Sequence, residues 1–196
     1  MDYKGDSYYI EQVLAGRTNA YSYIVDRYKD KAFNLAFRIC GNREEGEEVA
    51  QDSFLKAFRS LNNFMMKSSF ATWLYRIIFN TAISHIRSRK EALHSLEEFP
   101  ADASDFIGNN NNEEEAEKEY KESIVNYALS KVEEEERGLI SLYYYEDMKI
   151  DEISEVTGIS NSNIKIRLYR TRQKMLKIIE KLENRNSIVY ENTARF

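Results

Sequence analysis

The segment from Ile150 to Met175 constrains the fold of this chain more than any other. Two stretches with helical apolar spacing flank Gly158 and the polar cluster 160–163. The first stretch carries Ile150, Ile153 and Val156, and the second carries Ile164, Leu168 and Met175. Glycine suits the left-handed turn between two crossed helices, and Ser160 is a favourable N-cap for the second. The pattern predicts a helix-turn-helix, whose second helix lies in the major groove of DNA.

The preceding part of the chain also shows helical periodicity. Apolar residues recur with a period near 3.6 over 21–40, where Gly41 is suited to end a helix, and again over 70–89. Between these stretches a helix is expected to start among the acidic residues 44–48, which favour a helix N-terminus. It is expected to bury Val49, Phe54, Leu55 and Phe58. Because the chain has one proline and seven glycines, an all-β sandwich is disfavoured, and we predict an all-α fold.

Composition divides the chain into two small helical domains. The stretch between them holds the only proline, Pro100, and a Gly-Asn run at 108–112. From Glu91 to Glu119 there are ten acidic residues and one basic residue, so this stretch buries little apolar surface. We interpret it as a flexible acidic linker, and the last residues as a tail without usable periodicity. The predicted parts are two helical domains at 8–90 and 113–184, the linker at 91–112 and the tail at 185–196.

The net charge of −5 conceals a local excess of basic residues in the second domain. Between Asn161 and Lys181 there are seven basic residues and one acidic residue. Affinity for DNA depends on the local number of phosphate contacts rather than on the total charge. The acidic total still favours weak DNA binding by the free protein.

No arrangement of residues typical of an enzyme is present in the sequence. The two histidines, His85 and His94, are not spaced as metal ligands, and no glycine-rich phosphate loop occurs. The acidic run Glu133–Glu136 is interpreted as a solvated helix start, because consecutive helical side chains point to different sides. Because the chain has a single cysteine, Cys40, an internal disulfide is excluded. Cys40 is expected in the core. We therefore expect no catalysis, no cofactor and no metal.

The sequence also lacks the marks of membrane insertion or export. No apolar run approaches the roughly 18 residues that a membrane span needs, and the N-terminus has no signal-peptide layout. We expect a cytoplasmic protein that is not inserted in a membrane.

The segment from Phe64 to Lys90 combines aromatic, polar and basic residues in a way that suggests single-stranded DNA. Aromatic side chains beside a basic groove hold unstacked bases. Three members, Phe70, Trp73 and Ile77, are also interpretable as core residues. Further along, Asn80, Ser84 and His85 form a polar strip that ends in arginines, and a role in the core does not explain this strip.

The whole chain resembles bacterial sigma factors of the sigma-70 superfamily, in the extracytoplasmic-function group. The first domain is similar to sigma domain two through the stretch from Glu47 to Phe58 (Glu-Glu-Val-Ala-Gln-Asp-Ser-Phe-Leu-Lys-Ala-Phe) and through Phe70–Ile77 with Asn80. The second is similar to sigma domain four through Gly158–Arg172. The resemblance covers roughly 10–182, and both motifs occur in the family's order.

The resemblance implies three functional surfaces. A surface that docks on core RNA polymerase is formed by Glu48, Gln51, Asp52 and Leu55. A surface for the melted −10 element comprises the loop 61–69, with Phe64, Met65, Lys67 and Ser68, and then Asn80, Ser84, Arg87 and Arg89. The recognition helix over the −35 element carries Ser162, Asn163, Lys165, Ile166, Arg167, Tyr169 and Arg170. Lysine or arginine there reads guanine, asparagine reads adenine, and Ile166 suits a thymine methyl group.

The resemblance therefore implies a transcription initiation factor that directs core RNA polymerase to promoters, and an anti-sigma factor as a further partner. The main alternative is a stand-alone helix-turn-helix regulator, whose first domain serves as a sensor or a dimerisation module. A more distant alternative is a small helical enzyme with a DNA-binding appendage.

Overall fold

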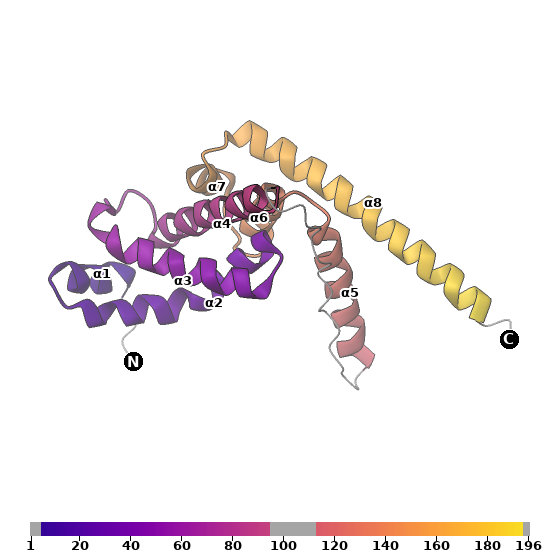
Figure 1. Ribbon diagram of the computed structural model, residues 1–196, viewed down its shortest axis with the longest axis horizontal. Coiled ribbons are helices and arrows are strands. Elements are labelled where there is room, and N and C mark those ends of the chain that lie inside the picture. The colour runs from indigo at the N-terminus through magenta and orange to yellow at the C-terminus, as the bar shows by residue number, and fades with distance from the viewer. Residues whose placement is uncertain (1–4, 95–112, 194–196) are drawn as a thin grey trace.

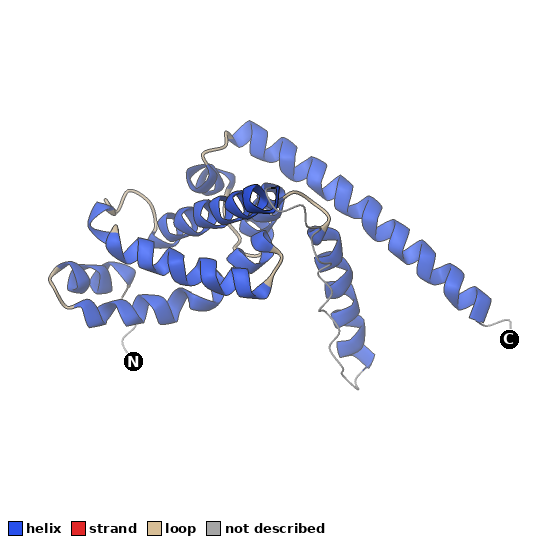
Figure 2. Ribbon diagram, in the orientation of Figure 1, coloured by secondary structure: helices blue, strands red, loops and turns tan. Residues whose placement is uncertain are grey.

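The computed structural model describes residues 5–94 and 113–193, and every regular element in those two ranges is a helix (Figures 1 and 2). The first range forms α1 (Asp6–Leu14), η1 (Thr18–Ala20), α2 (Tyr21–Cys40), α3 (Arg43–Arg59), η2 (Leu61–Asn63) and α4 (Phe70–His94). The second forms α5 (Glu113–Ser130), α6 (Glu134–Tyr144), α7 (Ile150–Thr157) and α8 (Asn161–Thr193). The prediction of an all-α fold is confirmed.

The predicted end of α2 and the predicted start of α3 are confirmed by their caps. Helix α2 ends at Gly41, which adopts φ 77°, a conformation that costs glycine little. Helix α3 begins after Asn42, whose side chain accepts a hydrogen bond of 3.0 Å from the Glu45 amide and so satisfies a donor that the helix leaves open. The short link between the two caps makes α2 and α3 antiparallel neighbours.

Close packing of α2, α3 and α4 builds the core of the first domain. At Gly46, α3 approaches α2 so closely that an added Cβ would lie 2.8 Å from Cα of Phe37. Helix α4 contributes Leu74, Ile78 and Ala82, all with no exposed surface. Cys40 is also buried, as predicted, and burial raises the pKa of its thiol to about 12. The thiol is therefore an inert packing group.

The helix-turn-helix is formed by α7 and α8, as the sequence predicts. Helix α7 ends at Gly158, which adopts φ 74°, and α8 starts directly after Ser160. Ile153 and Ile164, one from each helix, are fully buried and join the two helices. At the start of α7, the Lys149 amide donates a hydrogen bond of 2.9 Å to the Glu152 carboxylate.

The two domains pack against each other. Helix α4 contacts α7, and α2 contacts α6 (Figure 1). At Gly138 of α6 an added Cβ would lie 2.5 Å from a ring carbon of Phe79 on α4, so the approach is as close as the one inside the first domain. The two domains are also joined by a cation–π contact, with Arg38 3.7 Å from the Tyr145 ring centre, and by an ion pair, with Lys90 3.0 Å from Glu134.

At the predicted linker and the predicted tail, helices extend further than the sequence indicates. The predicted linker, 91–112, lies mostly outside the described residues, and α4 continues to His94. Helix α8 continues to Thr193, so it enters the tail in which no element was predicted. In Figure 1, α5 and α8 diverge as they leave the packed helices.

Candidate nucleic-acid interface

The outer face of α3 carries the four residues predicted to dock on polymerase. Glu48 and Gln51 are exposed, and Asp52 is half-buried and pairs with Lys56 at 2.8 Å. Leu55 is 54% exposed, which is high for a large apolar side chain on a helix that packs against two others. Residues three and four apart share one side of a helix, so the four lie together.

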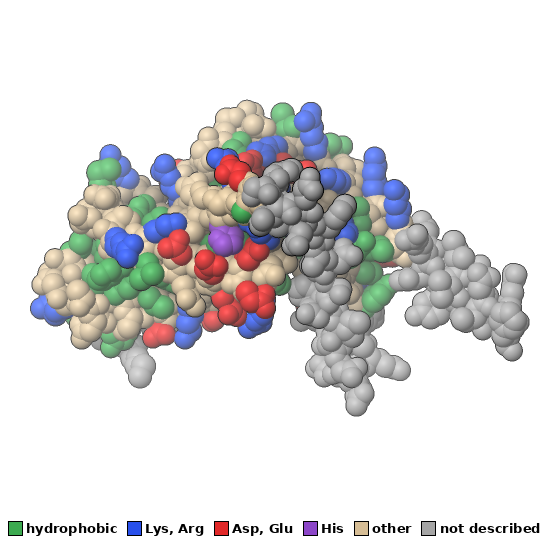
Figure 3. Space-filling model, in the orientation of Figure 1, with side chains coloured by type: hydrophobic (Ala, Val, Ile, Leu, Met, Phe, Trp, Pro, Cys, Tyr) green, Lys and Arg blue, Asp and Glu red, His purple; other side chains and the backbone are tan. Residues whose placement is uncertain are grey.

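The predicted burial of α3 is wrong for two residues. Val49 is buried and Phe54 half-buried, but Leu55 and Phe58 are both exposed. The exposed pair extends an apolar patch with Tyr21, whose ring lies 5.0 Å from that of Phe58. Figure 3 shows hydrophobic side chains over the left half of α3 and acidic ones over its right half. Phe58 is therefore an addition to the predicted surface, and its spacing of three residues from Leu55 is the signal that could have identified it.

The loop between η2 and α4 is held by an aromatic cluster and displays two long side chains. The ring of Phe64 packs against Phe70 and Trp73, with ring centres 5.6 and 5.2 Å apart. Met65 is 71% exposed, and Lys67 is exposed beside it. The loop residue Ser68 is half-buried. Phe64 thus supports the loop, whereas Met65 and Lys67 face outward.

Helix α4 presents a polar strip on the side away from the core. Asn80, Ser84 and Arg87 are exposed, as predicted for this strip. Arg76 is also exposed, and its spacing of four residues before Asn80 places it on the same face. Sequence reasoning missed Arg76. At the start of the helix Phe70 is buried, as expected for a core residue, whereas Trp73 and Ile77 are half-buried.

Arg89 differs from the other predicted residues of this strip. Its guanidinium lies 2.5 Å from Glu45 of α3, and both residues are half-buried. His85 lies 3.9 Å from the same carboxylate. Arg89 therefore ties α4 to α3 instead of extending the exposed strip.

The recognition helix alternates between buried and exposed positions. Ile164 and Leu168 face the domain core. Six predicted residues lie on the exposed side, namely Ser162, Asn163, Lys165, Ile166, Tyr169 and Arg170. Ile166 is 49% exposed and Tyr169 57% exposed, and so this side offers apolar and polar groups together.

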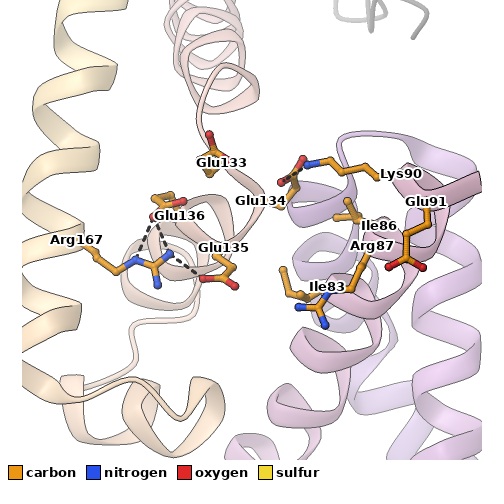
Figure 4. Close-up of a pocket in the computed structure, with 10 residues that line it drawn as sticks. All are labelled: Ile83, Ile86, Arg87, Lys90, Glu91, Glu133, Glu134, Glu135, Glu136 and Arg167. Carbon is orange, nitrogen blue, oxygen red and sulfur yellow. Dashed lines mark hydrogen bonds and ion pairs between the residues drawn. The ribbon is translucent and has the colours of Figure 1, made fainter. Parts of the chain in front are cut away.

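Arg167 is the exception on the recognition helix. It donates hydrogen bonds of 2.8 Å to Glu135 and 2.6 Å to Glu136, both at the start of α6 (Figure 4). Partial burial lowers the pKa of the guanidinium, but the hydrogen bonds to the two carboxylates outweigh this effect and raise the pKa overall. Arg167 therefore fixes α8 against α6.

Replacing Arg167 with alanine is expected to lower the melting temperature and to leave two carboxylates without their partner. The loss should be about 1–3 kcal/mol, because charge-assisted hydrogen bonds are among the stronger ones. Thermal unfolding followed by circular dichroism measures this effect. Replacing the exposed Lys165 with alanine is the matched control and should leave the melting temperature unchanged. An equal drop for both variants would contradict the distinction.

A pocket lies between the two domains beside Arg167. Its volume is about 450 Å³. Helix α4 lines it with Ile83, Ile86, Arg87, Lys90 and Glu91. The opposite side is lined by Glu133, which precedes α6, by Glu134, Glu135 and Glu136 of α6, and by Arg167 of α8 (Figure 4). The expected solvated helix start is therefore wrong in part, since Glu134, Glu135 and Glu136 are half-buried and ion-paired.

Acidic pH is expected to weaken the contact between the domains. Burial raises the pKa of Glu134, but the hydrogen bonds from Lys90 and from the backbone, together with the charges of Lys90 and Arg137, outweigh this effect, and the pKa lies below its usual value. A depressed carboxyl pKa gives stability that is present above pH 4.5 and is lost as the pH falls through the folded value. The contact is half-exposed, so the contribution is below about 1 kcal/mol. Urea unfolding across pH 3–6 measures it, and the variant Lys90→Met should lack this part of the pH dependence.

No metal site or membrane span is found in the parts of the chain that the structure describes. Within 5–94 and 113–193, no three His, Cys, Asp or Glu side chains are grouped to hold an ion. None of the helices described is both long and apolar enough to cross a bilayer.

Comparison with known proteins identifies the two domains separately. Residues 24–92 match the family model "Sigma-70 region 2", and residues 124–175 match "Sigma-70, region 4". The chain is 31% identical to the ECF RNA polymerase sigma factor SigW of Bacillus subtilis, over 88% of this chain and 96% of the relative. It is 28% identical to the RNA polymerase sigma-H factor of Pseudomonas aeruginosa, over 90% of this chain and 95% of the relative.

Two solved structures have a similar fold. One is the sigma factor RpoE in complex with the anti-sigma factor NepR from Bartonella quintana, with a TM-score of 0.67, 19% identity, and coverage of 82% of this chain and 96% of that one. The other is CnrH in complex with the cytosolic domain of CnrY, with a TM-score of 0.63, 20% identity, and coverage of 91% and 99%.

Proposed function

The chain belongs to the extracytoplasmic-function group of the sigma-70 family, and we propose from this premise that its three exposed surfaces divide the steps of transcription initiation. As a sigma factor it binds core RNA polymerase and directs the enzyme to specific promoters. The polymerase supplies the chemistry, so we assign no catalytic step to this chain. Its place of action is the cytoplasm, where bacterial core polymerase works.

We propose that the outer face of α3 docks on core polymerase. Exposed apolar side chains next to charged ones are typical of an interface with an apolar centre and a polar rim. Leu55 and Phe58 provide the apolar centre, and Glu48, Gln51 and Asp52 form the rim. The half-buried Tyr21 supports the centre, since its hydroxyl donates a 2.9 Å hydrogen bond to the Phe54 carbonyl.

The −10 element is read by the loop and by the polar strip of α4. The observation that carries this assignment is that α4 presents Asn80, Ser84 and Arg87 on one exposed face, while the loop at its start displays Met65 and Lys67. Unstacking a base costs a few kcal/mol, which contacts to the extruded base must offset. The arginine and lysine side chains attract the phosphate backbone of the DNA strand, and the loop surrounds the extruded base.

The −35 element is read by the exposed side of α8. Lys165 and Arg170 suit guanine, Asn163 suits adenine, and the methyl groups of Ile166 suit thymine. Each matched contact contributes about 1–3 kcal/mol of discrimination. Arg167 is excluded from this set, because its guanidinium is held by Glu135 and Glu136.

The two domains must separate before the chain can bind the −35 and −10 elements at the same time. By their labels, the −35 and −10 elements lie roughly 25 base pairs apart, which is roughly 85 Å along B-form DNA. Helix α7 of the −35 reader packs directly on α4 of the −10 reader. The compact arrangement is therefore the resting form, and the promoter complex requires the α4–α7 and α2–α6 contacts to separate.

An anti-sigma factor would preserve the compact form by binding across the domains. Two proteins with this fold, RpoE and CnrH, are known in complexes with NepR and CnrY. In this chain, the pocket between α4 and α6 is lined by the apolar side chains of Ile83 and Ile86, by basic side chains on one side and by acidic side chains on the other. An amphipathic segment with charges of both signs fits these walls.

Run-off transcription with purified bacterial core polymerase tests the proposed function. Genomic promoter templates are transcribed with and without the chain, and new transcripts should share two spaced sequence blocks upstream of their starts. Absence of new transcripts, together with absence of core binding in a pull-down, would contradict the proposal. The alternative of a stand-alone helix-turn-helix regulator is not favoured, because the exposed face of α3 would have no role in such a protein.

The free chain is expected to bind these promoters poorly. Its net charge is −5, and the compact form cannot contact both elements at once. In an electrophoretic shift, binding should become tight and specific only after core polymerase is added. A comparably tight shift by the chain alone would contradict this expectation.

A further inference from the structure

The methionines of this chain fall into two groups that differ in exposure. Met148 and Met175 are buried in the second domain, at 7% and 8% exposed. Met65 and Met66 are 71% and 47% exposed. They are consecutive residues of the loop between η2 and α4, at the end of the first domain away from α5 (Figure 1). Met1 lies outside the described residues, so the accessible thioethers that the structure describes share one loop.

Both ends of this loop are anchored. At its start, the ring of Phe64 packs edge-on against that of Phe70, with centres 5.6 Å apart. At its end, the Ser69 hydroxyl accepts a 3.0 Å hydrogen bond from the Thr72 amide in the first turn of α4. Between these anchors Met66 adopts φ 53°, a left-handed conformation that is uncommon for a residue with a side chain. Such a conformation persists where the surrounding structure imposes it, so the loop is held with its methionines on the surface.

The two methionines supply the exposed apolar surface of the loop. The other exposed residues between 61 and 69 are polar or charged, namely Asn62, Asn63, Lys67 and Ser69. A polarisable thioether is suited to contact with an aromatic ring, and a DNA base presents such a ring. In the −10 assignment above, the methionines therefore make the apolar contacts to the extruded base, whereas Lys67 attracts the phosphate backbone.

Oxidation would change these contacts directly. A methionine sulfoxide is polar, and its oxygen is an acceptor that suits neither an aromatic face nor a neighbouring phosphate. The other sulfur atoms that the structure describes are shielded, because Met148, Met175 and Cys40 are buried. Burial also raises the pKa of the Cys40 thiol to about 12, and the reactive form of cysteine is the thiolate. A mild oxidant therefore reaches the loop first.

We propose that Met65 and Met66 form an oxidation site at which hydrogen peroxide reversibly weakens capture of the −10 base. The proposal rests on the −10 assignment and adds a means of regulating it. The thioether sulfur attacks one peroxide oxygen, and the S–O bond forms as the O–O bond breaks. The departing hydroxide takes up the proton of the transferred oxygen and becomes water. Sulfur loses two electrons and the peroxide gains them.

The reverse step requires a thiol-dependent methionine sulfoxide reductase. Two thiols give two electrons to the sulfoxide and become a disulfide, and the sulfoxide oxygen leaves as water. The thioether is thereby restored, so the modification is reversible.

The test oxidises the full chain before it meets polymerase. Purified chain is treated with hydrogen peroxide, catalase removes the excess, and holoenzyme is assembled with untreated core polymerase. Peptide mass spectrometry gives the extent of oxidation at each methionine. The readout is dissociation from fork-junction DNA that carries, as a single strand, the −10 element of a promoter found by run-off transcription. Affinity for core polymerase is measured in parallel.

Two variants isolate the contribution of the loop. Met65→Leu/Met66→Leu keeps apolar side chains of similar volume without sulfur, and it should bind the fork within about twofold of wild type. Adding Leu176→Met to this variant places a thioether on α8 at a position that is 48% exposed, close to the 47% of Met66. The second variant is thus an oxidisable control whose new methionine lies away from the loop.

In the wild type, Met65 and Met66 should be oxidised before Met148 and Met175, and the fork should dissociate about tenfold faster, as expected from the loss of two sulfur–aromatic contacts. Methionine sulfoxide reductase with dithiothreitol should restore slow dissociation, and both variants should be insensitive to peroxide. Unchanged dissociation with both sulfoxides present would overturn the proposal. An equal loss in either variant, or a loss of affinity for core polymerase, would also overturn it. If untreated wild-type holoenzyme fails to bind the fork, the −10 assignment itself is wrong, and the proposed effect of oxidation fails with it.

Discussion

Replacing Gln51 with alanine and Asp52 with arginine is expected to reduce promoter-specific transcription by about 100-fold or more. Gln51 and Asp52 border the apolar centre of the proposed docking surface, and a reversed charge in an interface adds repulsion of several kcal/mol. The measurement is run-off transcription at fixed core polymerase, together with the affinity of the chain for core. Both residues lie on the outer face of α3, so the melting temperature should stay within 1–2 °C, roughly the range of a neutral surface change.

The chain offers a closely matched control for the charge reversal. Asp26 on α2 pairs with Lys29 at 3.1 Å, as Asp52 on α3 pairs with Lys56 at 2.8 Å. The variant Asp26→Arg thus breaks an equivalent ion pair on another surface of the same domain. It should retain transcription. If both variants lost activity equally, the loss would reflect net charge, and α3 would not be the docking surface.

Replacing Gly138 with alanine is expected to open the compact form. The added methyl carbon would lie 2.5 and 3.0 Å from two ring carbons of Phe79 and 3.4 Å from the Ile39 methyl group. Phe79 is buried, and overpacking of this kind costs about 1–3 kcal/mol. This cost falls on the closed state alone, so the population of open molecules should rise about 5- to 150-fold. Small-angle scattering should show a larger radius of gyration, and core polymerase should bind more tightly.

A substitution at a second glycine distinguishes separation of the two domains from a general loss of stability. At Gly46 an added Cβ would lie 2.8 Å from the backbone of Phe37, inside the first domain. The variant Gly46→Ala should therefore lower the melting temperature and transcription together, without an expanded form at low temperature. Gly5→Ala is the neutral reference, because nothing lies within 4 Å of the added carbon. An unchanged radius of gyration for Gly138→Ala would show that the domains separate by another route.

Local signals in the sequence were sufficient for the helices and their ends. Gly41 and Gly158 both adopt the left-handed conformation where the sequence predicts it, because backbone conformation depends on the residue itself. Two errors concern packing between distant segments. Leu55 and Phe58 have core-like spacing but are exposed, and periodicity alone does not distinguish an interface from a core.

The partners of charged residues were the least predictable part of the candidate site. Arg89 and Arg167 have the spacing of DNA contacts, yet they pair with Glu45 and with Glu135 and Glu136. These partners lie more than thirty residues away in sequence, so only the folded arrangement reveals them. The domain contacts at Gly138 had no sequence signal either, since a glycine inside a helix has no single structural meaning.

The length of α8 gives the recognition residues a mechanical connection to the far end of the molecule. The helix spans 33 residues, which is about 50 Å, and all six exposed recognition residues lie in its first ten positions. The helix rests against α5, α6 and α7, and four of its buried residues, Ile164, Leu168, Thr171 and Met175, lie in its first half. A tilt of about 10° around its centre would move each end by about 4 Å on this geometry, whereas productive contacts tolerate displacements of only about 0.5 Å. A partner that grips the distal half of α8 would therefore alter promoter recognition without touching a recognition residue.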